Sequence, residues 1–292
     1  MPQTATTGSL ENAQRIIIGA VRYTEEHNAP AMALIEQMTL ANGAKQVTVP
    51  KVGQMTISDL VDGQDIVDEE EIGMTTVDLT SAEVGAKVIV TDKLVRQSQP
   101  SVFGMIGRQL GDGFAVKEDN DVTSLYSSLN GGTDYGIANA KFNVTNVAAA
   151  IAKAKSNKFG SPLYINHHPN SVYIFAKSAA VTPSVTYPVP DGWSADLLKN
   201  FFSNLRPLNG VPIFEDGNIT VDSSDDAIGV IAAKGALVVL HSVKSRTERQ
   251  RDASLRATEV VFTADYGVFE LDDSRGAPFT CDAAAPSSAA TA

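Results

Sequence analysis

The chain has 292 residues, of which 43% are hydrophobic and 20% are charged, and its formal net charge is −11. This composition can fill a hydrophobic core, which excludes a disordered or fibrous protein, and the length suits one large domain or two. The acidic balance argues against a general nucleic-acid binder, because such proteins neutralise phosphates with Lys and Arg. The composition does not exclude a protein that encloses nucleic acid without binding its phosphates.

The cysteine content and the lack of long apolar runs limit where the chain folds. Cys281 is the one cysteine, so no disulfide can form within the chain, and folding needs no oxidising compartment. No stretch approaches the length of a membrane span, and the N-terminus lacks the pattern of a secretory signal. We therefore expect folding in a cytoplasm and no membrane partner.

The first forty residues predict little regular structure. Residues 1–10 are small and polar and form a terminal arm, and residues 11–25 hold a short helical patch of apolar residues. Residues 31–40 fit a short helix or a strand equally well, because their periodicity does not distinguish the two.

Residues 47–98 predict a long two-stranded arm. Apolar residues alternate at three places, marked by Val47 and Val49, by Val77 and Leu79, and by Val88 and Val90. An isolated hairpin is marginal in water, so an arm of this kind needs a surface to lie on. We hypothesise that this surface belongs to another copy of the same chain.

An acidic loop, residues 59–71, forms the tip of the arm. It contains no basic residue, and its seven acids are Asp59, Asp62, Asp65, Asp68, Glu69, Glu70 and Glu71. Two interpretations stay open. The loop is a plain solvated tip, or it lies across a basic patch of a neighbouring chain.

Residues 101–129 predict a long helix that follows the arm. Apolar residues recur mostly at spacings of three and four, Ser101 suits the first position, and Asn130-Gly131-Gly132 suits the end. The first half contains four glycines, each of which costs about 1 kcal/mol relative to alanine within a helix. We expect either a helix that bends or is closely approached, or two shorter helices broken near residues 111–113.

Residues 141–240 predict a compact α+β unit with helices on a sheet. The expected helices are 146–157 with Thr145 as its cap, one that begins at Pro169, and 195–204. The expected strands are 163–165 and 211–215, with a hairpin formed by 228–233 and 236–241.

The last segment combines a basic stretch with a long strand. The basic residues are Lys244, Arg246, Arg249, Arg251 and Arg256. Residues 259–271 alternate enough to form a strand, which we expect to pair with residues 84–91 beside the long helix. Residues 283–292 form an Ala/Ser tail without a folding signal.

We find no signature of a catalytic, cofactor or metal site. His167 and His168 are adjacent and therefore point differently, and Gly131-Gly132 lacks the partners of a phosphate-binding loop. Residues 222–226 suit a polar turn better than a calcium loop. Cys281 has no activating neighbour and lies near the chain end, so a nucleophile is not expected.

Complementary charge is the stronger signal. The acidic loop has no base, whereas Lys244, Arg246, Arg249 and Arg251 form a basic strand. Arginine pairs well with carboxylates. These groups either pair locally within one chain, or they specify how two chains meet, because electrostatics confers register and specificity.

The order of these segments resembles the tailed-bacteriophage major capsid proteins with the Hong Kong 97-type fold. The resemblance rests on Val84–Asp92 through Arg96-Gln97-Ser98 before the long helix, on the acidic extended loop, on Leu163–Asn166 before a helix, on Gly210–Ile213, and on Glu248-Arg249 through Tyr266-Gly267-Val268. It extends across nearly the whole chain.

The resemblance implies an α+β Hong Kong 97-type capsid fold with the following parts. Residues 1–46 are an N-terminal arm, 47–83 the extended β-hairpin loop, 84–140 and 241–282 a peripheral domain with spine helix 101–129, 141–240 an axial domain, and 283–292 a tail. It implies hexamers and pentamers in an icosahedral head shell that encloses double-stranded DNA, with extended loops over neighbouring subunits.

The resemblance also implies partners and a location. Only about forty residues precede the arm, so scaffolding, if the shell needs it, comes from a separate protein or from a removed piece. Portal and decoration proteins are further possible partners, and we expect a virion capsid assembled in the host bacterial cytoplasm. The alternatives are a shell protein of an encapsulin-like nanocompartment and, less favoured, an α+β enzyme.

Overall fold

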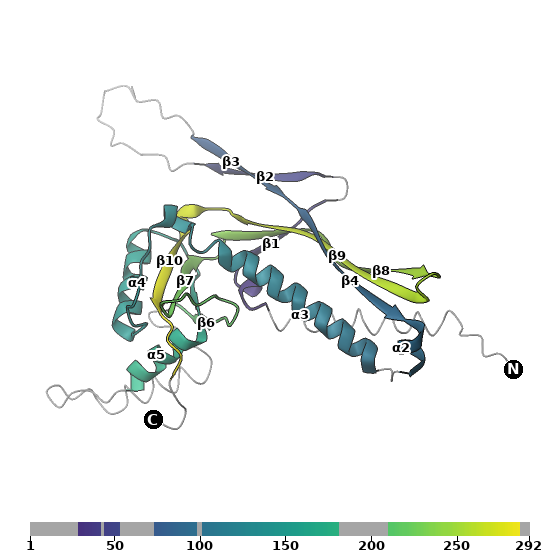
Figure 1. The fold of residues 1–292 in the computed structure, drawn as a ribbon. Helices are drawn as coiled ribbons and strands as arrows, with labels where there is room; N and C mark the ends of the chain where they lie inside the picture. Colours follow the sequence, from purple (N-terminus) through teal and green to yellow (C-terminus); the bar gives the residue numbers. More distant parts are fainter. Residues whose placement is uncertain (1–28, 42–43, 53–72, 98–100, 181–209, 287–292) are drawn as a thin grey trace, which may run out of the picture.

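The computed structural model describes residues 29–41, 44–52, 73–97, 101–180 and 210–286. They form three sheets, which Figure 1 shows with the helices around them. The long sheet has the strand order β1-β8-β9-β4, the second sheet has the order β10-β7-β5-β6, and β2 and β3 form a separate two-stranded hairpin, here called the arm hairpin.

The long sheet is built from Glu36–Thr39 (β1), Leu237–Asp252 (β8), Ala257–Glu270 (β9) and Ala82–Thr91 (β4). β4 pairs antiparallel with β9 from Ala82 opposite Tyr266 to Thr91 opposite Ala257. The predicted pairing of residues 84–91 with the terminal strand is therefore confirmed. Residues 31–40, left open between helix and strand, contain the short 3-10 helix Ala31–Ala33 (η1) and then β1.

One long helix, Ser101–Ser124 (α3), lies along one face of the long sheet (Figure 1). Phe114 packs edge-on against Phe262 and Tyr266 of β9, with ring centroids 5.1 and 5.8 Å apart. The Tyr266 hydroxyl also donates to Asp121 Oδ2 at 2.7 Å. The helix is continuous through residues 111–113, so the alternative of two shorter helices is wrong, and it ends five residues before the predicted position. The short helix Asp92–Gln97 (α2) precedes it, and Leu129–Gly132 (η2) follows it.

The second sheet is made of Leu163–His167 (β5), Ile213–Glu215 (β6), Asp226–Ala233 (β7) and Gly276–Asp282 (β10). Helices Val144–Ser156 (α4) and Pro169–Ala180 (α5) share a hydrophobic core with it. Tyr164 and Val230 of this sheet join the core that lies under α3, so the two sheets are connected through the end of that helix.

Three local expectations for the second sheet need correction. The predicted hairpin of 228–233 with 236–241 is wrong, because β7 pairs with β5 and β10 whereas β8 pairs with β1 and β9. Residues 276–282, expected with the peripheral domain, form β10 and pair with β7. Asn143 rather than Thr145 caps α4, since its side chain accepts the backbone N–H of Asn146. Asp273–Arg275 (η3) connects β9 to β10.

Truncation of the aromatic contact between α3 and the long sheet tests this packing. Phe262 is 2% exposed, and we expect Phe262→Ala to lower the free energy of unfolding by about 3–5 kcal/mol, because it removes a buried ring and leaves a cavity. Denaturant unfolding measures the change. Ile89→Ala on β4, where the side chain is 48% exposed, serves as the control, with an expected change of about 0.5 kcal/mol or less. Equal losses in the two variants would contradict the packing.

Candidate assembly surfaces

The arm hairpin lies on the face of the long sheet opposite α3 (Figure 1). Gln46–Val52 (β2) pairs with Met74–Thr80 (β3), which places Val47 opposite Leu79 and Val49 opposite Val77. These residues pack with Val238 and Leu240 of β8 in a separate apolar cluster. The predicted hairpin is therefore confirmed at its base, and its first supporting surface is the chain's own sheet.

A glycine lets the arm hairpin pass close over β9. A Cβ atom added to Gly267 would lie 2.3 Å from the carbonyl oxygen of Thr80, at the end of β3. Real Cβ atoms do not approach backbone this closely, so a side chain here would push the arm away. Gly267 therefore sets the position where the arm crosses the sheet.

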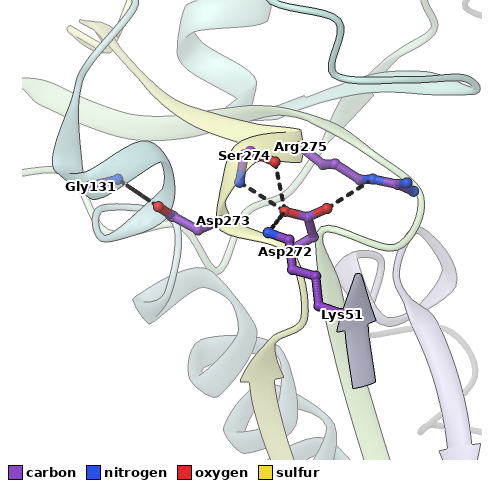
Figure 2. Close-up of polar contacts among 6 residues, drawn as sticks. All are labelled: Lys51, Gly131, Asp272, Asp273, Ser274 and Arg275. Atoms are coloured by element: carbon purple, nitrogen blue, oxygen red, sulfur yellow. Dashed lines mark hydrogen bonds and ion pairs between the residues drawn. The ribbon is translucent and has the colours of Figure 1, made fainter. Parts of the chain in front are cut away.

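A polar anchor fixes the base of the arm hairpin to the end of β9 (Figure 2). Lys51 of β2 forms an ion pair with Asp272, and Asp272 also accepts the Ser274 hydroxyl at 2.7 Å and pairs with Arg275 at 3.1 Å. Burial opposes ionisation of Asp272, but its bonds from Lys51 and Ser274 prevail and hold its pKa below the ordinary value. Lys51 thus ties the arm hairpin to the segment that follows β9.

The neighbouring acid serves a different element. Asp273 accepts the backbone N–H of Gly131 at 3.1 Å, which links η3 to η2 after the long helix (Figure 2). Asp272 and Asp273 are consecutive, yet one holds the arm and the other holds the end of the helical segment. This pair offers a matched comparison.

Neutralising Asp272 tests the anchor. We expect Asp272→Asn to weaken protection of the β2 and β3 amides by about 1 kcal/mol, the upper end for a partly exposed ion pair, in hydrogen–deuterium exchange of the full chain. Because the pKa of Asp272 is depressed, the anchor is complete above about pH 4 and is lost as the pH falls through that lower pKa.

Asp273→Asn is the control for that measurement, since it removes the neighbouring negative charge that faces Gly131 and leaves Lys51 paired with Asp272. If both variants loosened the arm hairpin equally, or neither did, the anchor would have no specific role.

The outer part of the arm lies outside the described residues. This applies to all seven acids of the acidic loop, Asp59, Asp62, Asp65, Asp68, Glu69, Glu70 and Glu71. Their expected contact with a neighbouring chain stays a prediction.

The basic strand is the second half of β8, and one of its edges is open. β1 pairs with β8 only as far as His241, so within the described residues the backbone groups beyond that point have β9 on one side and no strand on the other. An exposed strand edge is a template for pairing with another chain. Lys244, Arg246, Arg249 and Arg251 are exposed along it.

The register of β8 divides its basic residues between the two faces of the long sheet. Arg249 lies opposite Val260, which packs in the core under α3, and Arg251 lies two residues further on the same face. Arg246 lies opposite Thr263, which alternation places on the other face. The basic residues therefore lie on one strand, as the sequence predicted, but their side chains are divided between two faces and do not form one patch.

Two of the four basic residues have partners within the chain. Arg251 contacts both carboxylate oxygens of Asp92, at 2.5 and 2.7 Å, and this bond raises the pKa of the guanidinium group. Arg246 pairs with Glu248 at 2.7 Å. For Lys244 and Arg249, no carboxylate of the described residues lies within ion-pair distance. Ion pairs within the chain thus involve two of the four basic residues, Arg246 and Arg251.

The histidines flagged in the sequence serve structural roles. His167 is fully buried, and its Nε2 lies 3.0 Å from the carbonyl oxygen of Phe279 while its Nδ1 accepts the N–H of His168. Burial lowers the pKa of His167 to about 4, so the ring is neutral at pH 7. His168 Nδ1 accepts the N–H of Asn170 in the first turn of α5.

Cys281 lies in β10, is 1% exposed and belongs to the core of the second sheet. Burial raises the pKa of its thiol to about 12. A thiolate nucleophile at neutral pH is therefore disfavoured by position as well as by neighbours.

A groove of about 420 Å³ lies between the end of α3 and the second sheet, and it contains two acids, Asp222 and Asp226. Asp222 Oδ1 accepts the N–H groups of Ser224 and Asp226, and Asp226 Oδ1 accepts the N–H of Asn139. Both carboxylates thus hold loops, as the interpretation of 222–226 as a polar turn predicted.

Two further searches covered the described ranges only. There, no three His, Cys, Asp or Glu side chains gather as metal ligands would. No helix in those ranges is long and apolar enough to cross a membrane.

Solved structures with a similar fold are capsid shells. The capsid of cyanophage P-SCSP1u aligns with a TM-score of 0.63 at 14% identity, over 86% of this chain and 87% of that chain. The mature capsid of bacteriophage PhiM1 aligns with a TM-score of 0.63 at 15% identity, over 87% of each chain. A virus-like particle from Pyrococcus furiosus aligns with a TM-score of 0.58 at 12% identity, over 92% and 98%.

No protein-family model matches the sequence, and no curated protein sequence matches it. Similarity at these identities establishes the fold. The phage matches cover most of both chains. The chain therefore has the fold of the tailed-bacteriophage major capsid proteins.

Proposed function

We propose that the chain is a major capsid protein that self-assembles into the icosahedral head shell of a tailed bacteriophage. In this proposal it encloses the double-stranded DNA genome through hexamers and pentamers whose extended loops overlap neighbouring subunits. The observation that carries it is the extent of the match to phage capsid chains, about 87% of both partners for bacteriophage PhiM1.

The described surfaces support repeated contacts between copies. The arm hairpin is anchored at its base by Lys51 and packs through Leu79, so it leaves the body of the protein at a fixed position. β8 presents an open edge with Lys244 and Arg249 exposed. We propose that the acidic loop of one copy lies along this edge of the next copy. Its seven acids would then lie close to Lys244 and Arg249, which have no ion pair among the described residues.

The proposed partners follow from the same assembly. The shell would form in the host bacterial cytoplasm and become part of the virion, with a separate scaffolding protein, a portal and decoration proteins as further partners. DNA would be enclosed without sequence-specific binding, consistent with the net charge of −11, because an acidic surface repels phosphate.

A nanocompartment shell is the second candidate, favoured by the match to the Pyrococcus furiosus virus-like particle. Gene neighbours separate the two candidates. Portal and terminase genes beside this one support a phage head, and a gene for an enclosed enzyme supports a compartment. An α+β enzyme is less favoured, since the acids of the groove are engaged in loop bonds.

A charge exchange tests the contact between copies. We expect Asp68→Lys, Glu69→Lys, Glu70→Lys and Glu71→Lys together to abolish closed shells in electron micrographs, while the body of the protein folds normally by circular dichroism. The reason is that like charges would then face each other at the proposed contact. Neutral replacement of the same residues by Asn and Gln separates repulsion from loss of attraction.

The reciprocal variant makes the test specific. Lys244→Glu with Arg249→Glu should also impair assembly, and its combination with the reversed loop should restore shells. If shells form normally with the loop reversed, the acidic loop is a solvated tip. If reversal impairs assembly without rescue, its partner is another surface.

A further inference from the structure

A buried cluster of polar side chains joins α3 to the second sheet. Asp119 of α3 and Asp216, which follows β6, are 0% and 1% exposed, and Asn166 of β5 is 0% exposed. Asp and Glu are almost never buried unless they are paired. Two carboxyl groups from separate parts of the fold therefore need an explanation at this position.

The two carboxyl groups are held side by side by a donor residue that they share. Asp119 accepts the backbone N–H of Ala31 at 3.0 Å and the side-chain amide of Asn218 at 2.9 Å. Asp216 accepts the backbone N–H of the same Asn218 at 2.9 Å and the side-chain amide of Asn166 at 3.2 Å. Two buried carboxylates in one site repel each other when both are ionised, which favours a proton on one of them.

The other groups around the pair offer no positive charge at neutral pH. The Tyr126 hydroxyl accepts from Asn166 at 2.9 Å, and Tyr126 and Tyr164 are held neutral because burial raises the pKa of each phenol. His168 faces Asp216, and burial lowers its pKa. Among the described residues, no Lys or Arg lies within ion-pair distance of either acid.

The remaining groups near the pair are Glu118, the adjacent residue of α3, and two buried oxygen atoms. Glu118, next to Asp119, lies 3.9 Å from His241 Nδ1, and burial lowers the pKa of that histidine. Asn166 Oδ1 and the Tyr164 hydroxyl oxygen are buried without a hydrogen-bond partner among the described residues. The site thus has no spare donor on Asn166 and no cation to balance a second negative charge.

We propose that Asp119 and Asp216 form a pH-dependent latch between the long helix and the second sheet. The latch is closed while the pair shares one proton, and it opens when both carboxyl groups ionise. It connects three elements, because Asp119 also holds the amide of Ala31 in η1. This proposal concerns the folded chain itself and does not depend on shell assembly.

The direction of the pH dependence follows from burial. Burial, together with the neighbouring Asp216 carboxyl group, raises the pKa of Asp119 to about 7, although Asn218 and the Ala31 amide act in the opposite direction. An aspartate in the unfolded chain ionises near pH 4. The stabilisation by the protonated pair is therefore complete below about pH 4 and is lost as the pH rises to about 7.

Hydrogen–deuterium exchange of the full chain tests the latch. After correction for intrinsic rates, we expect protection of residues 29–35 and 213–219 to fall by about tenfold between pH 5.5 and 8.5, while β9 stays protected. Asp119→Asn carries a permanent donor in place of the proton, so its protection should not change with pH. Asp112→Asn, an exposed acid on the same helix, should retain the wild-type response.

Asp216→Asn is the second neutral variant, and it should show the same flat profile if Asp119→Asn folds poorly. Unchanged protection in the wild-type chain across this pH range would overturn the proposal. So would an equal loss in wild type and in a folded neutral variant, because the response would then come from other groups. If neither variant folds, the wild-type comparison of residues 29–35 with β9 still decides.

Discussion

The packing of α3 along the long sheet is the constraint on which the rest of the structure depends. Phe114, Phe262 and Tyr266 fill the interface on one face, which leaves the opposite face to receive the arm hairpin. The same helix contacts the segment after β6 through Asp119, and Tyr126, in the turn that follows the helix, accepts from Asn166 of β5. A single element thus supports the sheet that carries the arm and joins it to the remaining domain.

The sequence predicted those elements whose side chains follow a clear period. Alternation in residues 84–91 and in the terminal strand was enough to pair two segments that lie far apart, and the structure has that pair. Periodicity does not specify a partner, however. The segments on either side of Gly235 were expected to form a hairpin, yet β7 and β8 enter different sheets.

The polar contacts were less accessible to sequence reasoning than the apolar ones. Lys51 and Asp272 lie 221 residues apart and Asp119 and Asn218 lie 99 residues apart, and no local pattern indicates that either pair meets. The Asp-Asp-Ser run before β10 was a usable signal, since Asp272 caps the following turn through Ser274. The basic strand was recognised, but its division between two faces required the register of β8.

The arm hairpin packs on the chain's own sheet, and seven acids lie in the segment between its two strands. These acids would contribute to assembly if they contact another copy of the chain. The central claim is therefore self-assembly, and electron microscopy of the purified full-length chain, expressed alone and with its gene neighbours, tests it most directly. The account predicts closed icosahedral shells of uniform diameter. Monomers that persist at every salt concentration and pH, with no shells on co-expression, would contradict it.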